Sequence, residues 1–430
     1  MAIPIQQALE QGKGKVSIHG WVYRERKMKD MAFIVLRDST NILQCVVKQD
    51  NVSKEEWEIA EKILIESSVE IEGEIKEDKR APTGYEVKVT KLNLVSLAEP
   101  FPINKDQSKE FLADKRHLWI RSRKQTAILK IRSTVFGAIH DYFRGKGFYE
   151  HQSPIFQSTQ CEGGSTLFKV DYFGKELYLT QTWQLHAEAV IFALEKIYTI
   201  APSFRAEKSK TSRHLTEYWH AEMEVAWEGF DALQDYAEEM TKFVLKKVLE
   251  TNMAELEILE RDVSKLKPAL EKPFVRMTYS DALKVLNEKC GMKVEWGKDL
   301  RTIEEDELMK QYEVPVIVTC YPKCVKAFYM KENPDDQETV LGFDMLGPEG
   351  YGELIGASER EPDLEKIKQR LLEQGEDLAN YEFYLDTRRY GSVPHGGYGL
   401  GVERLISWIC GLETIKDAIA FPRTMIRYSP

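Results

Sequence analysis

The sequence has few cysteines for its length and no long apolar run. Its six cysteines are scattered over 430 residues. The closest pair, Cys320 and Cys324, has no second Cys or His pair nearby to complete a zinc site. We therefore expect free thiols and a cytoplasmic protein. No stretch of about 18 apolar residues predicts a membrane span. The segment MAIPIQQALEQGKGK also lacks the apolar core of a secretory signal.

An excess of positive charge is also missing. The chain has 60 Lys and Arg against 70 Asp and Glu, which gives a net charge of −10. General nucleic-acid binders are usually basic, so this class is disfavoured. A selective RNA binder needs only a local positive patch and stays possible. The length predicts two domains, and the 43% hydrophobic and 30% charged content is typical of globular proteins.

Residues 1–100 have an all-β pattern. Five strand-like runs are separated by turn residues: VSIHGWVYRER, MAFIVLRDS, ILQCVVKQ, SVEIEGEIKE and YEVKVTKLNLVS. A helical period at 53–65 falls between the third and fourth runs. This order predicts an OB-fold barrel, which often binds single-stranded nucleic acid. A small barrel that binds protein fits the pattern equally well.

A charged segment with two prolines separates this barrel from the rest of the chain. We predict an OB-fold domain at 1–100, a linker at 101–118 and a catalytic domain at 119–430. The second domain mixes strands with long helices, expected at about 122–146 and 232–250. The charged segment that runs to Lys272 should continue or cap the second helix. The predicted class is α+β.

The stretch FRAEKSKTSRHLTEYWHAEME at 204–224 predicts a hairpin with charge at its turn. Arg205 and Glu207 should share one side of a strand, because alternate residues do. An arginine held there can bind a carboxylate or an α-phosphate. Arg213 and His214 could reach outer phosphates, and Tyr218 offers a ring for adenine. An amphipathic hairpin with a charged loop is the simpler interpretation.

Two further stretches add an arginine and carboxylates. In GYGLGVERL, Arg404 starts an amphipathic helix, where it needs an anion or a solvent-facing position. In DMLGPEGYGELIGASERE, Asp344 and Glu353 are candidate Mg²⁺ ligands. Arg360 lies seven residues after Glu353, so on a regular strand the two would face opposite sides. A bulge or turn through Gly356 is required if both serve one site.

In order and spacing, the three stretches resemble motifs 2 and 3 of class II aminoacyl-tRNA synthetases. KGFYEHQSPI resembles motif 1, and the barrel with GWV and LRDSTNILQCVV is similar to the anticodon-binding domain of the aspartyl/asparaginyl/lysyl subgroup. The details are closest to the asparaginyl enzymes. The resemblance covers nearly the whole chain. It implies a catalytic antiparallel β-sheet flanked by helices, and ATP- and Mg²⁺-dependent ligation of asparagine to tRNA through an aminoacyl-adenylate.

The resemblance also implies roles for particular residues. Glu162 should bind the α-amino group of the amino acid with Gln184 beside it, and Arg360 should meet its side-chain carbonyl. Arg205 and Arg404 are the catalytic pair, Arg205 bridging the carboxylate and the α-phosphate. ATP should contact Arg205, Glu207, Arg213, His214, Tyr218, Glu353 and Arg404. In the barrel, the anticodon should meet Phe33, Gln44 and Glu86. Motif 1 around Pro154 implies a homodimer.

Two positions favour asparagine over aspartate. Aspartyl enzymes carry a lysine where this chain has Ala187, and an aspartate where it has Glu222. A glutamate can accept from an amide NH₂ but repels a carboxylate, and an unpaired buried charge costs several kcal/mol. Three alternatives remain: an aspartyl-tRNA synthetase that charges one or both tRNAs, an amide ligase of the asparagine synthetase type, and an inactive RNA-binding paralogue. Known amide ligases of that type lack the barrel.

Overall fold

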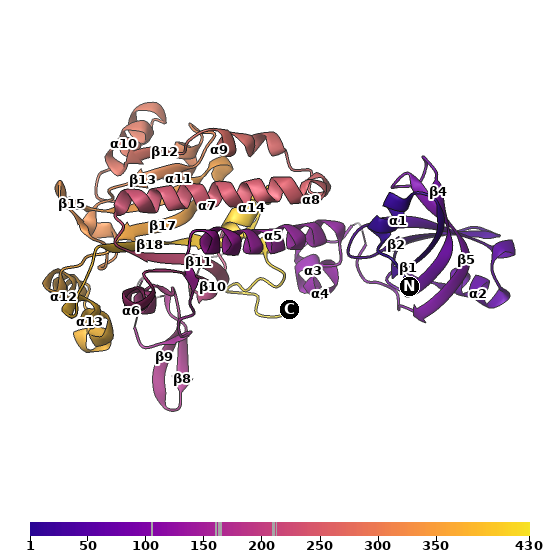
Figure 1. Cartoon of the computed structure of the whole chain (residues 1–430), viewed down its shortest axis with the longest axis horizontal. Coiled ribbons are helices and arrows are strands. Elements are labelled where there is room, and N and C mark those ends of the chain that lie inside the picture. The colour runs from indigo at the N-terminus through magenta and orange to yellow at the C-terminus, as the bar shows by residue number, and fades with distance from the viewer. Residues whose placement is uncertain (105, 160, 162–165, 209–210, 212) are drawn as a thin grey trace. The chain divides into compact units, whose positions relative to one another are not determined.

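The computed structural model describes residues 1–104, 106–159, 161, 166–208, 211 and 213–430. Its chain divides into two compact units, Met1–Ala113 and Asp114–Pro430 (Figure 1). None of the helices in the described ranges has the length and apolar composition needed to cross a bilayer.

The first unit is a closed five-stranded barrel with strand order β1-β2-β3-β5-β4. Its strands are β1 (Gly14–Lys27), β2 (Met31–Arg37), β3 (Ile42–Lys48), β4 (Ser68–Glu77) and β5 (Tyr85–Ser96), and its helices are α1 (Ile5–Gln11) and α2 (Lys54–Lys62). Helix α2 follows β3, and the Ser53 and Glu56 side chains close its first turn in a capping box. The predicted OB-fold, with a helix after the third strand, is confirmed.

Side chains on each barrel strand point alternately into the barrel and out of it, and this decides which of them form its core. On β2, Ala32, Ile34 and Leu36 are buried in the apolar core, while the residues between them are half-buried on the outer face. Phe33 therefore lies outside the barrel core. An aromatic ring on that face is available to a ligand.

The second unit is built on an eight-stranded sheet with order β12-β13-β16-β17-β18-β11-β10-β6. The five inner pairings are antiparallel, and the pair at each edge is parallel. Its strands are β6 (Tyr149–Glu150), β10 (Lys196–Phe204), β11 (Glu217–Ala226), β12 (Val275–Thr278), β13 (Val316–Thr319), β16 (Gly342–Gly347), β17 (Gly352–Glu359) and β18 (His395–Gly401). The predicted α+β class is confirmed, with a largely antiparallel sheet.

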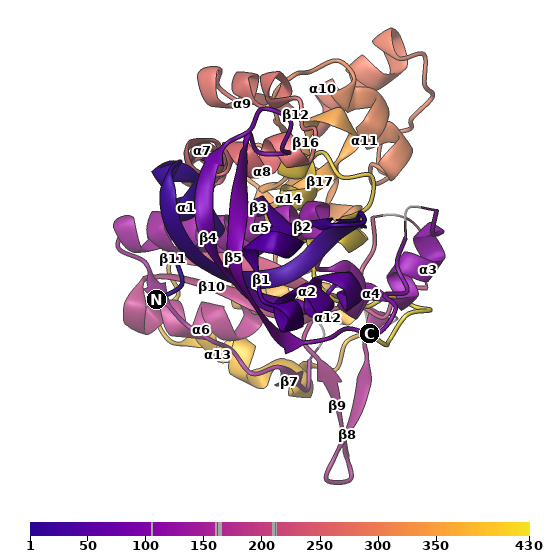
Figure 2. The ribbon, with the colours of Figure 1, turned by 90° about the vertical axis from the view of Figure 1, so that its right-hand side faces the viewer.

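Two smaller sheets and the helices complete the chain. The small sheets are β14 (Glu332–Asn333) with β15 (Asp336–Val340), and β7 (Phe156–Gln157) with β9 (Lys175–Leu179) and β8 (Lys169–Tyr172). The β8–β9 hairpin extends away from the large sheet (Figures 1 and 2). The helices are α3 (Lys109–Asp114), α4 (Arg116–Trp119), α5 (Arg123–Gly145), α6 (Gln184–Leu194), α7 (Phe230–Thr251), α8 (Met253–Ile258), α9 (Lys267–Glu271), α10 (Tyr279–Lys284), α11 (Thr302–Met309), α12 (Leu364–Glu373), α13 (Glu382–Arg389) and α14 (Val402–Cys410).

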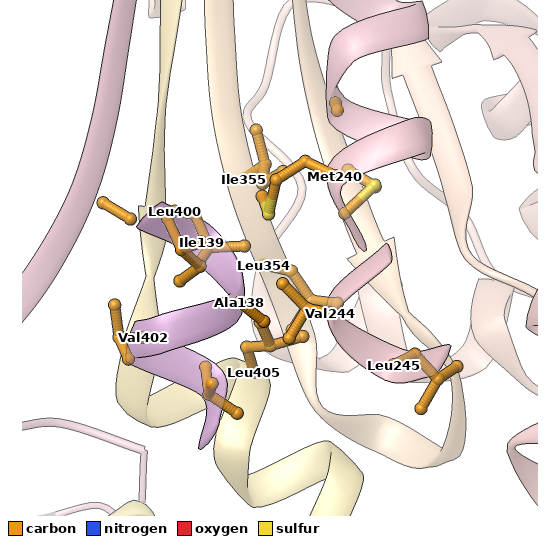
Figure 3. Close-up of a cluster of buried hydrophobic side chains, with 14 of the residues drawn as sticks. Ala138, Ile139, Met240, Val244, Leu245, Leu354, Ile355, Leu400, Val402 and Leu405 are labelled. Carbon is orange, nitrogen blue, oxygen red and sulfur yellow. The ribbon is translucent and has the colours of Figure 1, made fainter. Parts of the chain in front are cut away.

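Helices α5 and α7 run side by side across one face of the large sheet (Figure 1). Figure 3 shows the apolar side chains between them and β17, β18 and α14, including Ile139, Val244, Leu354, Leu400 and Leu405. Burying each aliphatic side chain of this size contributes roughly 1.5–3 kcal/mol. This layer holds the strands that carry the candidate site.

Helix α7 (Phe230–Thr251) ends within two residues of the predicted helix at 232–250 and does not continue into the charged segment. Asn252 has φ −122°, outside the helical region, and a separate helix begins at Met253. The charged segment to Lys272 therefore forms short helices instead of continuing α7.

Candidate active site

The site lies on three neighbouring strands, β11, β18 and β17. In the antiparallel register, Glu222 lies opposite Gly399 and Glu224 lies opposite Gly397. A Cβ on Gly397 would lie 2.1 Å from the Met223 carbonyl oxygen and 2.2 Å from Glu224 Oε2. Gly397 of β18 therefore makes room for the Glu224 carboxylate, and Gly399 makes room for the His220 ring.

A cavity of about 660 Å³ opens above these strands. It is lined by six of the residues selected from the sequence: Gln184, Arg205, Glu222, Asp344, Glu353 and Arg360. The predicted amino-acid and metal residues that the structure describes are thus brought together. Glu162, also selected, lies outside the described residues.

A smaller cavity of about 130 Å³ adjoins the first and shares Arg205 and Glu353 with it. All seven residues predicted to contact ATP line it: Arg205, Glu207, Arg213, His214, Tyr218, Glu353 and Arg404. A ligand with a polar head and an anionic tail can span the two cavities past Arg205.

The predicted strand position of Arg205 and Glu207 is wrong. Strand β10 ends at Phe204. Two residues later, the backbone N–H of Ala206 donates to the carbonyl oxygen of Thr166 instead of to strand β11. The two side chains still meet, with Arg205 Nη1 3.9 Å from Glu207 Oε1. The Arg205 guanidinium also lies 5.9 Å from the centre of the Tyr218 ring.

Carboxylates and a carbonyl orient the other basic side chains. Arg213 Nη2 lies 2.9 Å from Asp306 Oδ2, and His214 Nε2 lies 3.3 Å from Glu207 Oε2. Burial lowers the pKa of His214, and nearby arginines add to this effect against the opposing influence of Glu207. Arg404, in the first turn of α14 as predicted, donates to the backbone carbonyl of Glu353.

Asp344 and Glu353 converge over Gly356. A Cβ on this glycine would lie 3.0 Å from Glu353 Oε1 and 3.9 Å from Asp344 Oδ1. Because glycine has no Cβ, space is left between the two carboxylates. Burial and the Asp344 charge raise the pKa of Glu353, and a cation placed here would relieve both effects. Two carboxylates beside the cavity lined by the predicted ATP residues fit the chemistry of Mg²⁺.

The bulge that the sequence required lies two residues before Gly356. On β16, Met345 and Leu346 pair with Ile355 and Glu353, so Leu354 is the extra residue of β17. This shift brings Glu353 and Arg360 to the same cavity.

Arg360 is held by a residue that the sequence reasoning missed. Its Nε and Nη2 donate to Glu224 at 2.9 and 2.8 Å, and its Nη1 donates to Ser358 Oγ at 2.7 Å. Both charged partners are buried and line the larger cavity. Two carboxylates at alternate positions in the apolar second half of β11, Glu222 and Glu224, were the available signal.

Glu222 is also buried, and the protein supplies donors to it. Its Oε2 accepts from the backbone N–H of Trp183 at 2.9 Å, and its Oε1 accepts from the Thr182 hydroxyl. Ala187 is fully buried in an apolar cluster with Trp183 and Ile191. This alanine is packed as core and is absent from the described cavity lining.

Three further charged side chains near Asp344 and Glu353, namely Lys326, Asp299 and Glu305, were not selected from the sequence. Lys326 Nζ lies 2.7 Å from Asp344 Oδ2 and 3.7 Å from Asp299 Oδ1. Glu305 on α11 is half-buried and has a pKa raised to about 8, because it is partly removed from solvent and Glu353 is close. These residues come from a segment without a recognisable motif, and only folding brings them to the site.

A second set of carboxylates lies behind the larger cavity. The side-chain oxygen or nitrogen atoms of Glu188, Glu224 and His395 all lie within 4.8 Å of one another. This spacing is compatible with a metal site. However, Arg388 and Arg360 already pair with the two carboxylates, at 2.6 and 2.8 Å. This set is therefore better described as an ion-pair network.

In the barrel, Phe33, Gln44 and Glu86 line one cavity of about 470 Å³ together with Arg24, Arg26 and Arg80. Gln44 Nε2 donates to Glu86 Oε2 at 3.2 Å, and Lys76 Nζ lies 3.1 Å from Glu86 Oε1. An aromatic ring beside hydrogen-bonding and basic groups suits an unstacked base.

Comparison with known proteins supports the same interpretation. Residues 108–425 match the family model of tRNA synthetases class II (D, K and N), and residues 16–95 match that of the OB-fold nucleic acid binding domain. The chain belongs to the class II tRNA synthetases. This confirms the family predicted from the sequence motifs.

Individual relatives of this synthetase are similar over nearly their full length. The asparagine–tRNA ligase of Thermoplasma acidophilum is 48% identical over 97% of this chain and 96% of its own. The asparaginyl-tRNA synthetase of Pyrococcus horikoshii, solved with asparaginyl-adenylate, is 46% identical with TM-score 0.96 and full coverage of both chains. That of Entamoeba histolytica, also with asparaginyl-adenylate, is 32% identical with TM-score 0.87, over 97% of this chain and 96% of its own.

Proposed function

We propose that this synthetase ligates asparagine to tRNA in two steps, through asparaginyl-adenylate made from ATP. The observation that carries the proposal is the pair of adjoining cavities that share Arg205, one lined by amino-acid candidates and one by ATP candidates. The prediction of an asparagine–tRNA ligase is confirmed by relatives of that name, which are 43–48% identical over 97–100% of this chain.

In the first step, the asparagine carboxylate attacks the α-phosphorus of ATP and displaces pyrophosphate. The two anions repel each other, and the enzyme's task is to align them and to neutralise the charge that develops on the phosphate. Arg205, at the junction of the cavities, contacts both. Tyr218 stacks on adenine, and Arg213, His214 and Arg404 bind the phosphate tail, with Glu207 orienting His214.

Asp344 and Glu353 would hold Mg²⁺ in this proposal. The ion would supply positive charge that neutralises the phosphates of ATP. Lys326 keeps Asp344 in place through an ion pair.

In the second step, a hydroxyl of the terminal tRNA ribose attacks the adenylate carbonyl, the mixed anhydride C–O bond breaks and AMP leaves. The barrel cavity at Phe33, Gln44 and Glu86 binds the anticodon, Phe33 by stacking. The predicted boundaries at 1–100, 101–118 and 119–430 assign these two tasks to separate domains and stay predictions.

A homodimer through motif 1 is part of the proposal. Pro154 is exposed, and Tyr149, Ile155 and Phe156 nearby expose 59%, 41% and 49% of their surface. Apolar side chains gathered on one segment favour a protein interface there. Light scattering of the protein and of an Ile155→Asp variant tests this, since loss of the dimer is expected in the variant.

The test of the amino-acid assignment is ATP–pyrophosphate exchange with asparagine and aspartate side by side. Exchange with asparagine at least about 10³-fold more efficient is expected, because aspartate would place a charge beside buried Glu222 and Glu224. Equal rates would refute asparagine specificity and favour an enzyme that charges both tRNAs. An amide ligase would instead consume ATP with aspartate and ammonia, independently of tRNA.

A further inference from the structure

Glu188, on the first turns of α6, has a carboxylate that the proposed chemistry does not use. Its side chain is fully buried behind the larger cavity. Oε2 accepts from Tyr384 at 2.8 Å and lies 2.6 Å from Arg388 Nη2 and 3.1 Å from His395 Nε2. Two donors from α13 and the His395 ring of β18 therefore surround one oxygen of this carboxylate.

The other oxygen faces a residue of the candidate site. Oε1 accepts from Gln184 Nε2 at 2.8 Å, and Arg360 Nε lies 3.8 Å away. Gln184 and Glu188 are four residues apart, so they share one face of α6. Gln184 also lines the larger cavity.

The charge of Glu188 determines which way the Gln184 amide points. Although burial alone would raise the pKa of Glu188, Arg388, His395 and Arg360 outweigh it and hold this pKa well below its usual range. An ionised carboxylate can only accept hydrogen bonds, so the amide must turn its NH₂ toward Glu188. The carbonyl oxygen of Gln184 is then directed to accept from a ligand.

We propose that Glu188 is a positioning residue, which orients Gln184 so that its carbonyl oxygen binds the α-ammonium group of the amino acid. This rests on the proposed function. An ammonium group offers three donors and no acceptor, so an amide in the opposite orientation would present NH₂ to it and lose the bond. Tyr384 and Arg388 act indirectly, because they hold the Glu188 carboxylate in place.

The test is Glu188→Gln, assayed by ATP–pyrophosphate exchange. An amide at 188 can both donate and accept, so the orientation of Gln184 is no longer imposed. We expect the KM for asparagine to rise about 10- to 100-fold, the equivalent of a lost charge-assisted hydrogen bond, while the KM for ATP changes less than about twofold. Glu365→Gln, which alters a carboxylate exposed at 77% on α12, is the matched control.

A purely structural role predicts a different result. Glu188→Gln would then lower the melting temperature and kcat and leave the KM for asparagine unchanged, which would overturn the proposal. A double variant, Glu188→Gln with Gln184→Ala, further distinguishes the positioning role from the structural role. If Glu188 acts through Gln184, the double variant has about the same KM for asparagine as Gln184→Ala alone, whereas multiplied effects would refute the mechanism.

Tyr384→Phe covers the case in which Glu188→Gln fails to fold. It removes one hydrogen bond to Glu188 and keeps the aromatic ring, so we expect an increase in KM for asparagine of about 3- to 10-fold. A folded variant with wild-type KM would overturn the proposal. If the wild type itself shows no asparagine-dependent exchange, the proposed function fails instead, and the two failures are distinguishable.

Discussion

Replacing Glu224 with glutamine should change the amino acid that this synthetase accepts. In the wild type, two hydrogen bonds of 2.8 and 2.9 Å tie Arg360 to Glu224, and the guanidinium is fully charge-compensated. Glu224→Gln keeps the size of the side chain and removes its charge. The buried Arg360 then loses its nearer anion and keeps only Glu188 at 3.8 Å, so an aspartate carboxylate in the same cavity can pair with it.

The expected magnitude follows from these contacts. A hydrogen bond to a charged group contributes about 1.5–3 kcal/mol, so pairing aspartate with the released Arg360 should improve its kcat/KM about 10- to 150-fold. Asparagine should lose efficiency, because the position of Arg360 is no longer fixed by Glu224. The ratio of the two kcat/KM values therefore shifts toward aspartate by at least about tenfold.

ATP–pyrophosphate exchange with each amino acid measures this ratio directly. Thermal unfolding must accompany it, since breaking a buried ion pair costs about 3–5 kcal/mol and the variant should melt at a lower temperature. Glu338→Gln, at an exposed position of β15, is the control. A folded Glu224→Gln enzyme with an unchanged ratio would refute the idea that Glu224 and Arg360 set the selectivity.

Three other variants test separate parts of the molecule. Arg404→Ala should raise the KM for ATP about 10- to 100-fold in the exchange assay, since the phosphate tail loses a charged donor; an unchanged KM would place Arg404 away from the nucleotide. Phe33→Ala should reduce tRNA charging about 5- to 150-fold and spare exchange, through lost base stacking; a stable variant with normal charging would remove Phe33 from the anticodon cavity. Glu305→Gln should stabilise the ligand-free enzyme at pH 8 to about 9 and much less at pH 5, as measured by thermal unfolding.

Local patterns in the sequence predicted the regular elements well. The strands of the barrel alternate in burial as their sequences alternate in polarity, and α7 begins and ends within two residues of its apolar period at 232–250. The ATP candidates could be selected because motif residues such as Arg205 and Arg404 stand out as charges in apolar or glycine-rich surroundings.

Long-range pairs could not be predicted in this way. Arg360 and Glu224 are 136 residues apart, and no local period connects them. Lys326, Glu305 and Asp299 reach the site from segments whose sequences resemble ordinary charged surface. Their proximity depends on the order of β13, β16 and β17 in the sheet, which sequence patterns alone do not determine.

The expected pH dependence of Glu305→Gln follows from the sign of one pKa shift. Burial and the neighbouring Glu353 raise the pKa of Glu305 from 4.5 to about 8 in the folded protein. Between these two values the folded state binds a proton that the unfolded state has released, so wild-type stability falls as pH rises through this window and levels off above it. The glutamine side chain does not ionise, so the stability of the variant does not fall with pH through this group. The difference in melting temperature should thus grow from pH 5 to pH 8 and then stay constant. A difference that is independent of pH would show that the carboxyl group of Glu305 is ionised throughout, and that the arginines beside it, rather than its burial, determine its charge.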